Sequence, residues 1–254
     1  MRAVLFDLDG TLVQSERLKA RSYAVAAQRL QGLAEPDERA VEAYREIVGS
    51  ERNVASRHIM QSLSLEPMLR PLMAKRGVDT PEAVLSELRV GIYNAMVADP
   101  QVIRDHQWPH TIALLRVTKE SSCSTGLATM SQRKEALHVL RSLDIEQLLD
   151  VVVSREDVAK PKPDPEIYLL TASRLGVPPE ECLVLEDSVM GVRAGVAAGM
   201  NVIAVATPFT EAALARELPV PPEWVVDNSD ALPEVVRRRI EVHNRVAHPE
   251  MTGQ

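Results

Sequence analysis

The stretch Val4-Leu5-Phe6-Asp7-Leu8-Asp9-Gly10-Thr11 decides how the rest of this chain is interpreted. Its apolar residues favour a short buried strand, and Asp7 and Asp9 follow where that strand should stop. Side chains two residues apart on an extended chain point to the same side, so the two carboxylates should lie together. Like charges at that spacing repel unless a cation lies between them or one carboxyl keeps its proton. Gly10 lets the backbone turn sharply, and we expect Thr11 to hydrogen-bond back towards the carboxylates.

An isolated Asp-x-Asp-Gly can also be a solvated strand end, in which aspartate and glycine only form a turn. The choice between the two interpretations depends on whether further polar residues follow other predicted strands in a consistent order. Three later stretches of the chain do so, and they are described below.

Length and composition limit the possible classes of protein. The 254 residues suffice for one large or two smaller domains, and 29 Lys and Arg against 36 Asp and Glu give a net charge of −7. This acidity argues against a nucleic-acid partner, whereas a small anionic substrate stays compatible, because local cations or a metal can invert the field in one pocket. No apolar run has the length of a membrane span, and the N-terminus does not resemble a signal peptide. We therefore expect a cytoplasmic protein without a membrane partner.

The two cysteines, Cys123 and Cys182, are too few for a disulfide scaffold and show no metal-binding spacing. Both precede apolar runs, so we expect free thiols that are buried or half-buried.

Hydrophobic periodicity divides the chain into two kinds of region. From residue 15 to 97 the apolar residues recur at helical spacing between turn residues, which predicts an all-helical module of four to five helices. From residue 98 to 243, short apolar runs alternate with helical patterns, which predicts strand–helix units. The tail from 244 to 254 is polar and aperiodic, so we expect it to be loosely held.

The alternating region predicts an α/β fold. Strand–helix units with fully apolar strands are typical of a parallel sheet that is covered on both faces, and ligands bind such sheets beyond the carboxyl ends of the strands. Asp7, Thr129, Glu186 and Asp187 all follow predicted strands, so one cleft can hold them.

Three stretches complete a series with the first one. Gly126-Leu127-Ala128-Thr129-Met130-Ser131 ends a strand on a hydroxyl, Val158-Ala159-Lys160-Pro161-Lys162-Pro163-Asp164-Pro165 puts lysine before a helix, and Leu183-Val184-Leu185-Glu186-Asp187-Ser188 ends a strand on two acids. In this order, the four stretches resemble the motifs of the haloacid dehalogenase-like superfamily, over nearly the whole chain. The resemblance implies a Rossmann-like parallel-sheet core with an inserted all-helical cap, similar to the β-phosphoglucomutase and phosphoglycolate phosphatase group.

The resemblance assigns roles to the two carboxyls of the first motif. Asp7 would be the nucleophile and Asp9 the general acid/base. An aspartate carboxylate can accept a phosphoryl group, and the acyl phosphate so formed is open to attack by water. The second carboxyl would first protonate the leaving oxygen and then activate that water.

The second and third motifs would bind the phosphoryl group. The resemblance gives this role to the hydroxyl of Thr129, the backbone N–H of Met130 and the ammonium of Lys160. Relatives commonly carry Asn or Ser where Met130 stands, so a side-chain contact is not expected there. The family pattern Lys-Pro-x-Pro-Asp places the catalytic lysine at Lys160, and Lys162 then falls at its variable position, expected in solvent.

The fourth motif would complete a metal site. By resemblance Asp187 is a direct ligand, Glu186 acts directly or through water, and Asp7 and the main-chain carbonyl of Asp9 are the other ligands. Hard oxygen ligands and an anionic substrate suit Mg²⁺, which binds through few carboxylates and keeps several waters.

The helical module leaves the core directly after the first motif, as the cap does in many family members. Such a cap closes over a cleft, excludes water and selects the substrate. Candidate contacts with substrate in the cap are Lys19, Arg21 and Arg52, although a basic residue on a helix is more often simply solvated.

These observations favour a magnesium-dependent phosphatase acting on a small phosphorylated metabolite. One alternative is a sugar phosphomutase of the same family, which carries a His on the first cap helix where this chain has Lys19, and a phosphate-binding Arg about where Arg52 stands. Another is a binding protein that keeps the fold without activity. Haloacid dehalogenases lack the second Asp of the first motif, so Asp9 argues against them.

Overall fold

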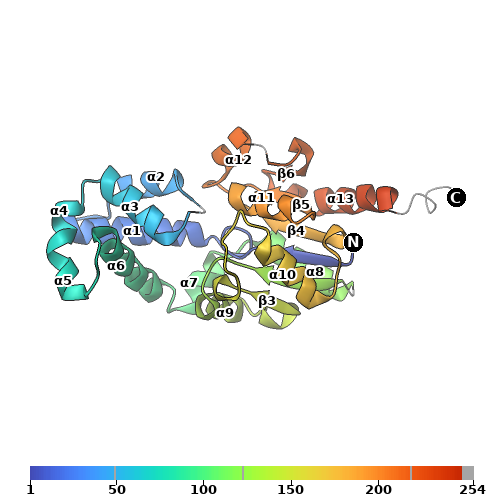
Figure 1. Cartoon of the computed structure of the whole chain (residues 1–254), viewed down its shortest axis with the longest axis horizontal. Coiled ribbons are helices and arrows are strands. Elements are labelled where there is room, and N and C mark those ends of the chain that lie inside the picture. The colour runs from blue at the N-terminus through green and yellow to red at the C-terminus, as the bar shows by residue number, and fades with distance from the viewer. Residues whose placement is uncertain (49, 122, 218, 248–254) are drawn as a thin grey trace. The chain divides into compact units, whose positions relative to one another are not determined.

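The computed structural model describes residues 1–48, 50–121, 123–217 and 219–247. The chain forms two compact units, which we call the core unit (Met1–Gln14 with Ile103–Gln254) and the cap unit (Ser15–Val102) (Figure 1). The first crossing between them falls at the predicted residue, and the second falls after residue 102 instead of residue 97.

The cap unit consists of helices. These are α1 (Ser15–Gln31), α2 (Arg39–Arg45), α3 (Arg52–Ser62), the single turns α4 (Glu66–Leu69) and α5 (Met73–Arg76), and α6 (Pro81–Met96), followed by α7 (Pro100–Asp105) across the second crossing. Helix α6 begins as its sequence predicts, because the Thr80 side chain accepts a hydrogen bond from the N–H of Ala83 at 3.3 Å and Pro81 occupies the first turn. It packs against α1 and α3.

A six-stranded parallel sheet forms the centre of the core unit, which confirms the predicted α/β fold. Its strands are β1 (Ala3–Phe6), β2 (Ser124–Ala128), β3 (Val151–Val153), β4 (Cys182–Glu186), β5 (Asn201–Val205) and β6 (Val225–Val226), in the order β3-β2-β1-β4-β5-β6. All residues of β1 and β4 are buried, as expected for strands covered on both faces. Because β1 lies between β2 and β4, the carboxyl ends of these three strands meet, and each of them carries a predicted motif.

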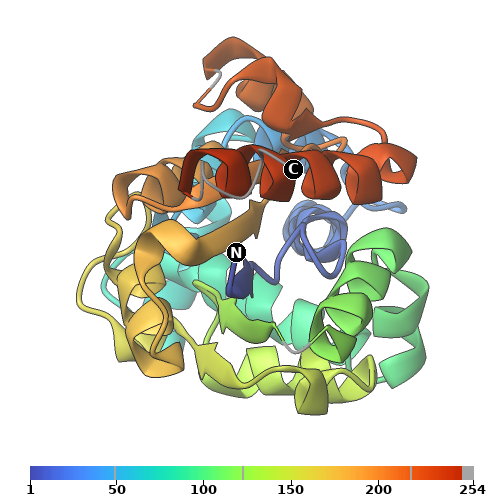
Figure 2. The same cartoon turned by 90° about the vertical axis from the view of Figure 1, so that its right-hand side faces the viewer.

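Helices cover both faces of this sheet. They are α8 (Pro109–Glu120), α9 (Arg133–Ser142), α10 (Glu166–Leu175), α11 (Val189–Ala197), α12 (Glu211–Glu217) and α13 (Leu232–Ala247). Helix α10 packs on β1, β2 and β3, whereas α8 packs on β2 and contacts α13, and Figure 2 shows α8 and α10 on opposite sides of the strands.

Two elements differ from the sequence-based expectation. Helix α12 was not predicted, because its seven residues give too short a periodic pattern. Helix α13 extends to Ala247, so the predicted loose tail is helical from residue 244 to 247, and its remaining residues, 248–254, lie outside the described part of the chain. In the part of the chain that the structure describes, no helix has the length and apolar character needed to cross a membrane.

The structure confirms the expected state of the two cysteines. Both are free thiols, Cys182 buried and Cys123 half-buried. Cys182 pairs with Ala3 across one edge of β1, whereas Cys123 directly precedes Ser124, which pairs with Ala3 across the other edge.

Candidate active site

A buried lysine connects two of the predicted site carboxylates. The ammonium of Lys162 donates to Asp7 Oδ1 at 2.7 Å, to Glu186 Oε1 at 2.6 Å and to the carbonyl of Ala128 at 3.0 Å. These acceptors lie at the carboxyl ends of β1, β4 and β2, so one side chain from the segment before α10 joins three strands. The side chains of Lys162, Asp7 and Glu186 are 6%, 8% and 1% exposed, so the charges interact with little screening by water.

Burial and charge shift the pKa values of this cluster in a consistent way. Burial raises the pKa of Asp7 to about 8, although Lys162 opposes this shift, and the carboxylates of Glu186 and Asp9 add to it. Burial alone would lower the pKa of Lys162, but the attraction of Asp7 and Glu186 is stronger and raises it well above its usual value. Lys162 therefore stays charged, whereas Asp7 ionises less readily than an ordinary aspartate.

Glu186 is fully engaged by protein donors. Its Oε1 accepts from Lys162 and from the hydroxyl of Tyr168 at 3.1 Å, and its Oε2 accepts from the N–H and the hydroxyl of Ser188 at 2.9 and 3.0 Å. Gly191 on α11 permits this placement, because a Cβ there would lie 1.7 Å from Glu186 Oε1. A carboxylate has about four acceptor positions, and here all of them are used. One of these donors is the ammonium of Lys162, and the role of Glu186 at a metal ion, directly or through water, stays a prediction.

The structure corrects the prediction for the two lysines of the third motif. Lys162, expected in solvent, is the lysine that contacts Asp7. The side chain of Lys160 is 72% exposed and pairs with Asp164 at 3.4 Å. The sequence repeats Lys-Pro, so the pattern Lys-Pro-x-Pro fits from either lysine, and the match from Lys160 places the motif two residues too early.

The turn after β1 holds the second carboxyl of the first motif. Gly10 has a φ of 91°, which only glycine adopts readily, and its N–H donates to the carbonyl of Val13 at 2.7 Å. Asp9 Oδ2 accepts a hydrogen bond from the hydroxyl of Ser131 at 2.5 Å. Thr11 is buried, and its hydroxyl has no hydrogen-bond partner in the described residues, so the expectation that it bonds to the carboxylates is wrong.

The loop after β2 brings the second motif close to this turn through Ser131. The Thr129 hydroxyl accepts the N–H of Ser131 at 3.0 Å, and the N–H of Thr129 donates to Val153 at 3.0 Å. The hydroxyl of Thr129 can still donate its own proton. The side chain of Met130 packs against the hydrophobic core, which leaves its backbone N–H as the group that could meet an anion.

The oxygen atoms of the site suit a hard cation. Among the described residues, no three His, Cys, Asp or Glu side chains are gathered as a metal cluster. The carboxylates of Asp7 and Asp187 are buried and follow β1 and β4, and the carbonyl of Asp9 was predicted to join them. Mg²⁺ is commonly held by one or two carboxylates and completed by water and substrate oxygens, so these residues fit it.

The candidate cap residues lie at the beginnings of two helices. Lys19 belongs to the second turn of α1 and Arg52 is the first residue of α3, and both are partly exposed. Arg21 pairs with Glu38 at 2.8 Å on the surface.

Sequence inspection overlooked Arg89 in the cap unit. It is 6% exposed, and its Cζ lies 5.4 Å from the ring centroid of Tyr23 and 5.9 Å from that of Tyr93. Its Nε has no hydrogen-bond partner, and no carboxylate pairs with it within the described residues. Its position four residues after Leu85 and four before Tyr93, on the apolar face of α6, was the signal in the sequence.

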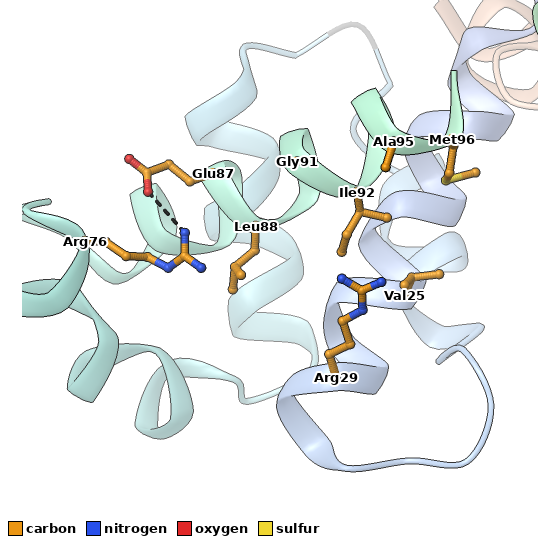
Figure 3. A pocket seen from close by; sticks show the side chains of 9 residues that line it. All are labelled: Val25, Arg29, Arg76, Glu87, Leu88, Gly91, Ile92, Ala95 and Met96. Atoms are coloured by element: carbon orange, nitrogen blue, oxygen red, sulfur yellow. Dashed lines mark ion pairs between the residues drawn. The ribbon is translucent and has the colours of Figure 1, made fainter. Parts of the chain in front are cut away.

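A shallow groove of about 490 Å³ lies on α1 and α6 of the cap unit (Figure 3). Apolar residues such as Leu88 and Ile92 line it together with charged ones, and two of these, Arg76 and Glu87, form an ion pair of 3.5 Å. It contains none of the predicted site residues.

Comparisons with known proteins agree with this geometry. The family model of haloacid dehalogenase-like hydrolases matches residues 1–199, and the chain belongs to this family. It is 33% identical over 201 residues to a phosphorylated carbohydrates phosphatase of Thermotoga maritima, with 79% of this chain and 83% of that protein covered. It is 32% identical over 202 residues to a phosphoglycolate phosphatase of Salmonella typhi, with 78% and 79% covered.

A solved structure has the same fold. β-Phosphoglucomutase from Clostridium difficile superposes with a TM-score of 0.71 over 97% of this chain and 99% of that one, at 20% identity, which supports the fold alone. The chain is thus a haloacid dehalogenase-like hydrolase with phosphatases among its relatives.

Proposed function

We propose that this protein is a magnesium-dependent phosphatase that hydrolyses a small phosphorylated metabolite through an aspartyl phosphate on Asp7. The observation that carries the proposal is the buried contact of 2.7 Å between Lys162 and Asp7, beside a second carboxyl at Asp9. The ammonium of Lys162 favours the ionised, nucleophilic form of Asp7 and can also hold a phosphoryl oxygen, so this pair is suited to phosphoryl transfer. The substrate class follows the printed activities of the two phosphatase relatives.

In the first half-reaction, a carboxylate oxygen of Asp7 attacks phosphorus, and the bond from phosphorus to the leaving oxygen breaks. Asp9, protonated at this stage, gives its proton to that oxygen. Lys162 replaces Lys160 as the lysine that offsets the negative charge and holds a phosphoryl oxygen. The hydroxyl of Thr129 and the N–H of Met130 donate to the other oxygens.

In the second half-reaction, water attacks the phosphorus of the aspartyl phosphate. Asp9, now ionised, takes a proton from that water, and the bond between phosphorus and the Asp7 oxygen breaks to release inorganic phosphate. Asp7 and Asp9 return to their starting states, so the protons balance over one turnover.

Mg²⁺ would be held by Asp7, Asp187 and the carbonyl of Asp9. When bound, it would supply the positive charge that buried Asp7 lacks and polarise the phosphoryl group. We assign Glu186 the task of orienting Lys162, because its four acceptor positions are occupied.

The cap unit would recognise the rest of the substrate. Arg89 joins the original candidates Lys19 and Arg52, because a buried guanidinium without a carboxylate partner gains most from an anionic or strongly polar ligand. Among the three, we assign the leading role to Arg89.

A phosphomutase remains the second candidate, favoured by the position of Arg52 at the start of α3. Lys19 argues against it, because lysine stays charged near neutral pH, whereas the histidine of the mutases can change its charge. Incubation with Mg²⁺, glucose 1-phosphates and a trace of sugar bisphosphate separates the two functions. Efficient formation of glucose 6-phosphate without phosphate release would overturn the hydrolase.

A phosphate-release screen over phosphorylated sugars, nucleotides and glycolytic acids tests the main proposal, with Mg²⁺ or with EDTA. We expect activity that EDTA removes and magnesium restores. Asp7→Asn should abolish turnover, because an amide cannot attack phosphorus, and Asp9→Asn should lower it by about a hundredfold or more through lost acid–base catalysis. Full activity of Asp7→Asn would exclude the aspartyl phosphate.

A further inference from the structure

The hydroxyl of Ser131 contacts the carboxyl of the proposed acid/base, Asp9. Its Oγ lies 2.5 Å from Asp9 Oδ2, a short hydrogen bond between residues 122 positions apart in the chain. Ser131 comes from the loop after β2, whereas Asp9 comes from the turn after β1. Neither the nucleophile nor the lysine takes part in this bond.

Ser131 is itself held in place by its backbone. Its N–H donates to the Thr129 hydroxyl at 3.0 Å, and its carbonyl accepts the N–H of Arg155 at 3.2 Å. Arg155 begins a 3₁₀ turn with a complete capping box between Ser154 and Asp157. The hydroxyl therefore projects from a backbone that is fixed on both sides, as a residue that orients a catalytic group requires.

We propose that Ser131 is a positioning residue that holds the carboxyl of Asp9 in the orientation for proton transfer in both half-reactions. The inference rests on the proposed phosphatase function. The hydroxyl of Ser131 can donate to Asp9 Oδ2 whether the carboxyl is ionised or protonated, which leaves Oδ1 to carry the catalytic proton. It can thus keep one rotamer of Asp9 while the proton on Oδ1 leaves for the leaving oxygen and is replaced from the attacking water.

The leaving-group dependence of kcat/KM tests this role. This constant covers only the steps up to release of the leaving group, and an alkoxide needs a proton whereas p-nitrophenolate does not. Ser131→Ala should lower kcat/KM for an alkyl phosphate by about tenfold, the rate equivalent of one hydrogen bond to a charged group, and for p-nitrophenyl phosphate by less than about twofold. Asp9→Asn should show the same selectivity with a larger loss.

Matched variants separate positioning from structure. Ser131→Thr keeps the hydroxyl and should retain activity on the alkyl phosphate within about threefold. Ser173→Ala, at an exposed position on α10, should leave kcat/KM unchanged for both substrates. If Ser131→Ala does not fold, Ser131→Cys carries the same prediction, because a thiol is a weak donor of similar size.

The outcomes are distinguishable from failure of the proposed function. An equal loss on both substrates, or no loss on the alkyl phosphate, would overturn the positioning role while the phosphatase stands. A wild-type protein that hydrolyses no phosphomonoester would remove the phosphatase and this inference together.

Discussion

The core unit and the cap unit each bury a cation, but the core unit pairs its cation with carboxylates, whereas the cap unit surrounds its cation with aromatic rings. The side chain of Lys162 is 6% exposed and contacts two carboxylates, those of Asp7 and Glu186. Arg89 is also 6% exposed, but its neighbours are the rings of Tyr23 and Tyr93, and no carboxylate pairs with it in the described chain. Loss of a compensated cation leaves buried anions behind, whereas loss of an uncompensated one leaves only neutral groups.

This difference matches the two tasks of the proposed phosphatase. The chemistry at Asp7 requires charges of fixed position, and the protein supplies both signs itself. Recognition of a variable substrate requires a group whose partner comes from the ligand, which is the role that we propose for Arg89. The variants Lys162→Met and Arg89→Met test the two halves of the comparison.

The largest effect is expected for Lys162→Met. Turnover should fall by about a hundredfold or more, because the charge beside the nucleophile is lost. The free energy of unfolding should fall by about 3–5 kcal/mol, since Asp7 and Glu186 are left buried without their cation. Urea denaturation and phosphate release measure the two effects, and Lys160→Met, at the exposed lysine of the same motif, should change neither.

The loss of stability in Lys162→Met should depend on pH. The pKa of Asp7 is already raised to about 8 with Lys162 present, and removal of the lysine raises it further. A raised carboxyl pKa costs stability as pH rises above the unfolded value near 4, because the folded state resists ionisation. Both proteins keep Asp7 protonated below about pH 8, and only the wild type ionises it as pH rises through that value, so the variant should lie closer to the wild type at about pH 6 than at about pH 9.5. An equal loss at both values would mean that the carboxylates are not the cause.

A smaller effect is expected for Arg89→Met. Against the best substrate of the screen, kcat/KM should fall by about tenfold, the loss of one charge-assisted hydrogen bond, whereas p-nitrophenyl phosphate should react within about twofold of the wild type. The free energy of unfolding should change by less than about 1 kcal/mol, because no buried anion loses its partner when the charge is removed.

Arg29→Met is the matched control for Arg89→Met, because Arg29 is exposed on α1 of the same unit. Arg29→Met should change neither kcat/KM for the two substrates nor the free energy of unfolding. A loss of several kcal/mol in Arg89→Met would show that the guanidinium is structural, and equal losses on both substrates would remove its role in recognition.

The sequence alone predicted the parallel sheet and the motif residues at the carboxyl ends of its strands, because these depend on local patterns. Apolar runs mark buried strands, and polar residues directly after them must gather at one edge of a parallel sheet. The sharp turn predicted at Gly10 is equally local, and the structure has it with a φ of 91°.

Local sequence patterns could not show which of the two lysines of the third motif turns inward. Lys160 and Lys162 have nearly the same local sequence, and the path of the loop between β3 and α10 decides which one turns inward. The acceptors that receive the inward lysine are distant in the chain, because Asp7, Ala128 and Glu186 lie 155, 34 and 24 positions from Lys162. The bond from Ser131 to Asp9 likewise joins two loops that are distant in the chain.

In the core unit, Asp157 is an anion whose charge is compensated by neighbouring donors, and its loss should have a smaller effect than the loss of Lys162. Asp157 accepts from the N–H and hydroxyl of Ser154, both at 2.8 Å, from Arg174 at 3.1 Å and from Arg133 at 2.5 Å. Burial opposes ionisation, but these donors outweigh it and lower the pKa of Asp157 to about 2. A lowered carboxyl pKa gives stability that is complete above the unfolded value near 4 and is lost as pH falls towards 2.

Asp157→Asn should therefore cost about 1–2 kcal/mol at pH 7, as expected for hydrogen bonds to a charged group near the surface. The difference from the wild type should shrink as pH falls from about 5 towards 2, because the wild-type carboxylate is then protonated as well. Urea denaturation across this range measures it, with Asp79→Asn, at an exposed aspartate of the cap unit, as a control without effect. A difference that stays constant with pH would assign the loss to the shape of the hydrogen-bond network, and charge compensation would then account for Lys162 but not for Asp157.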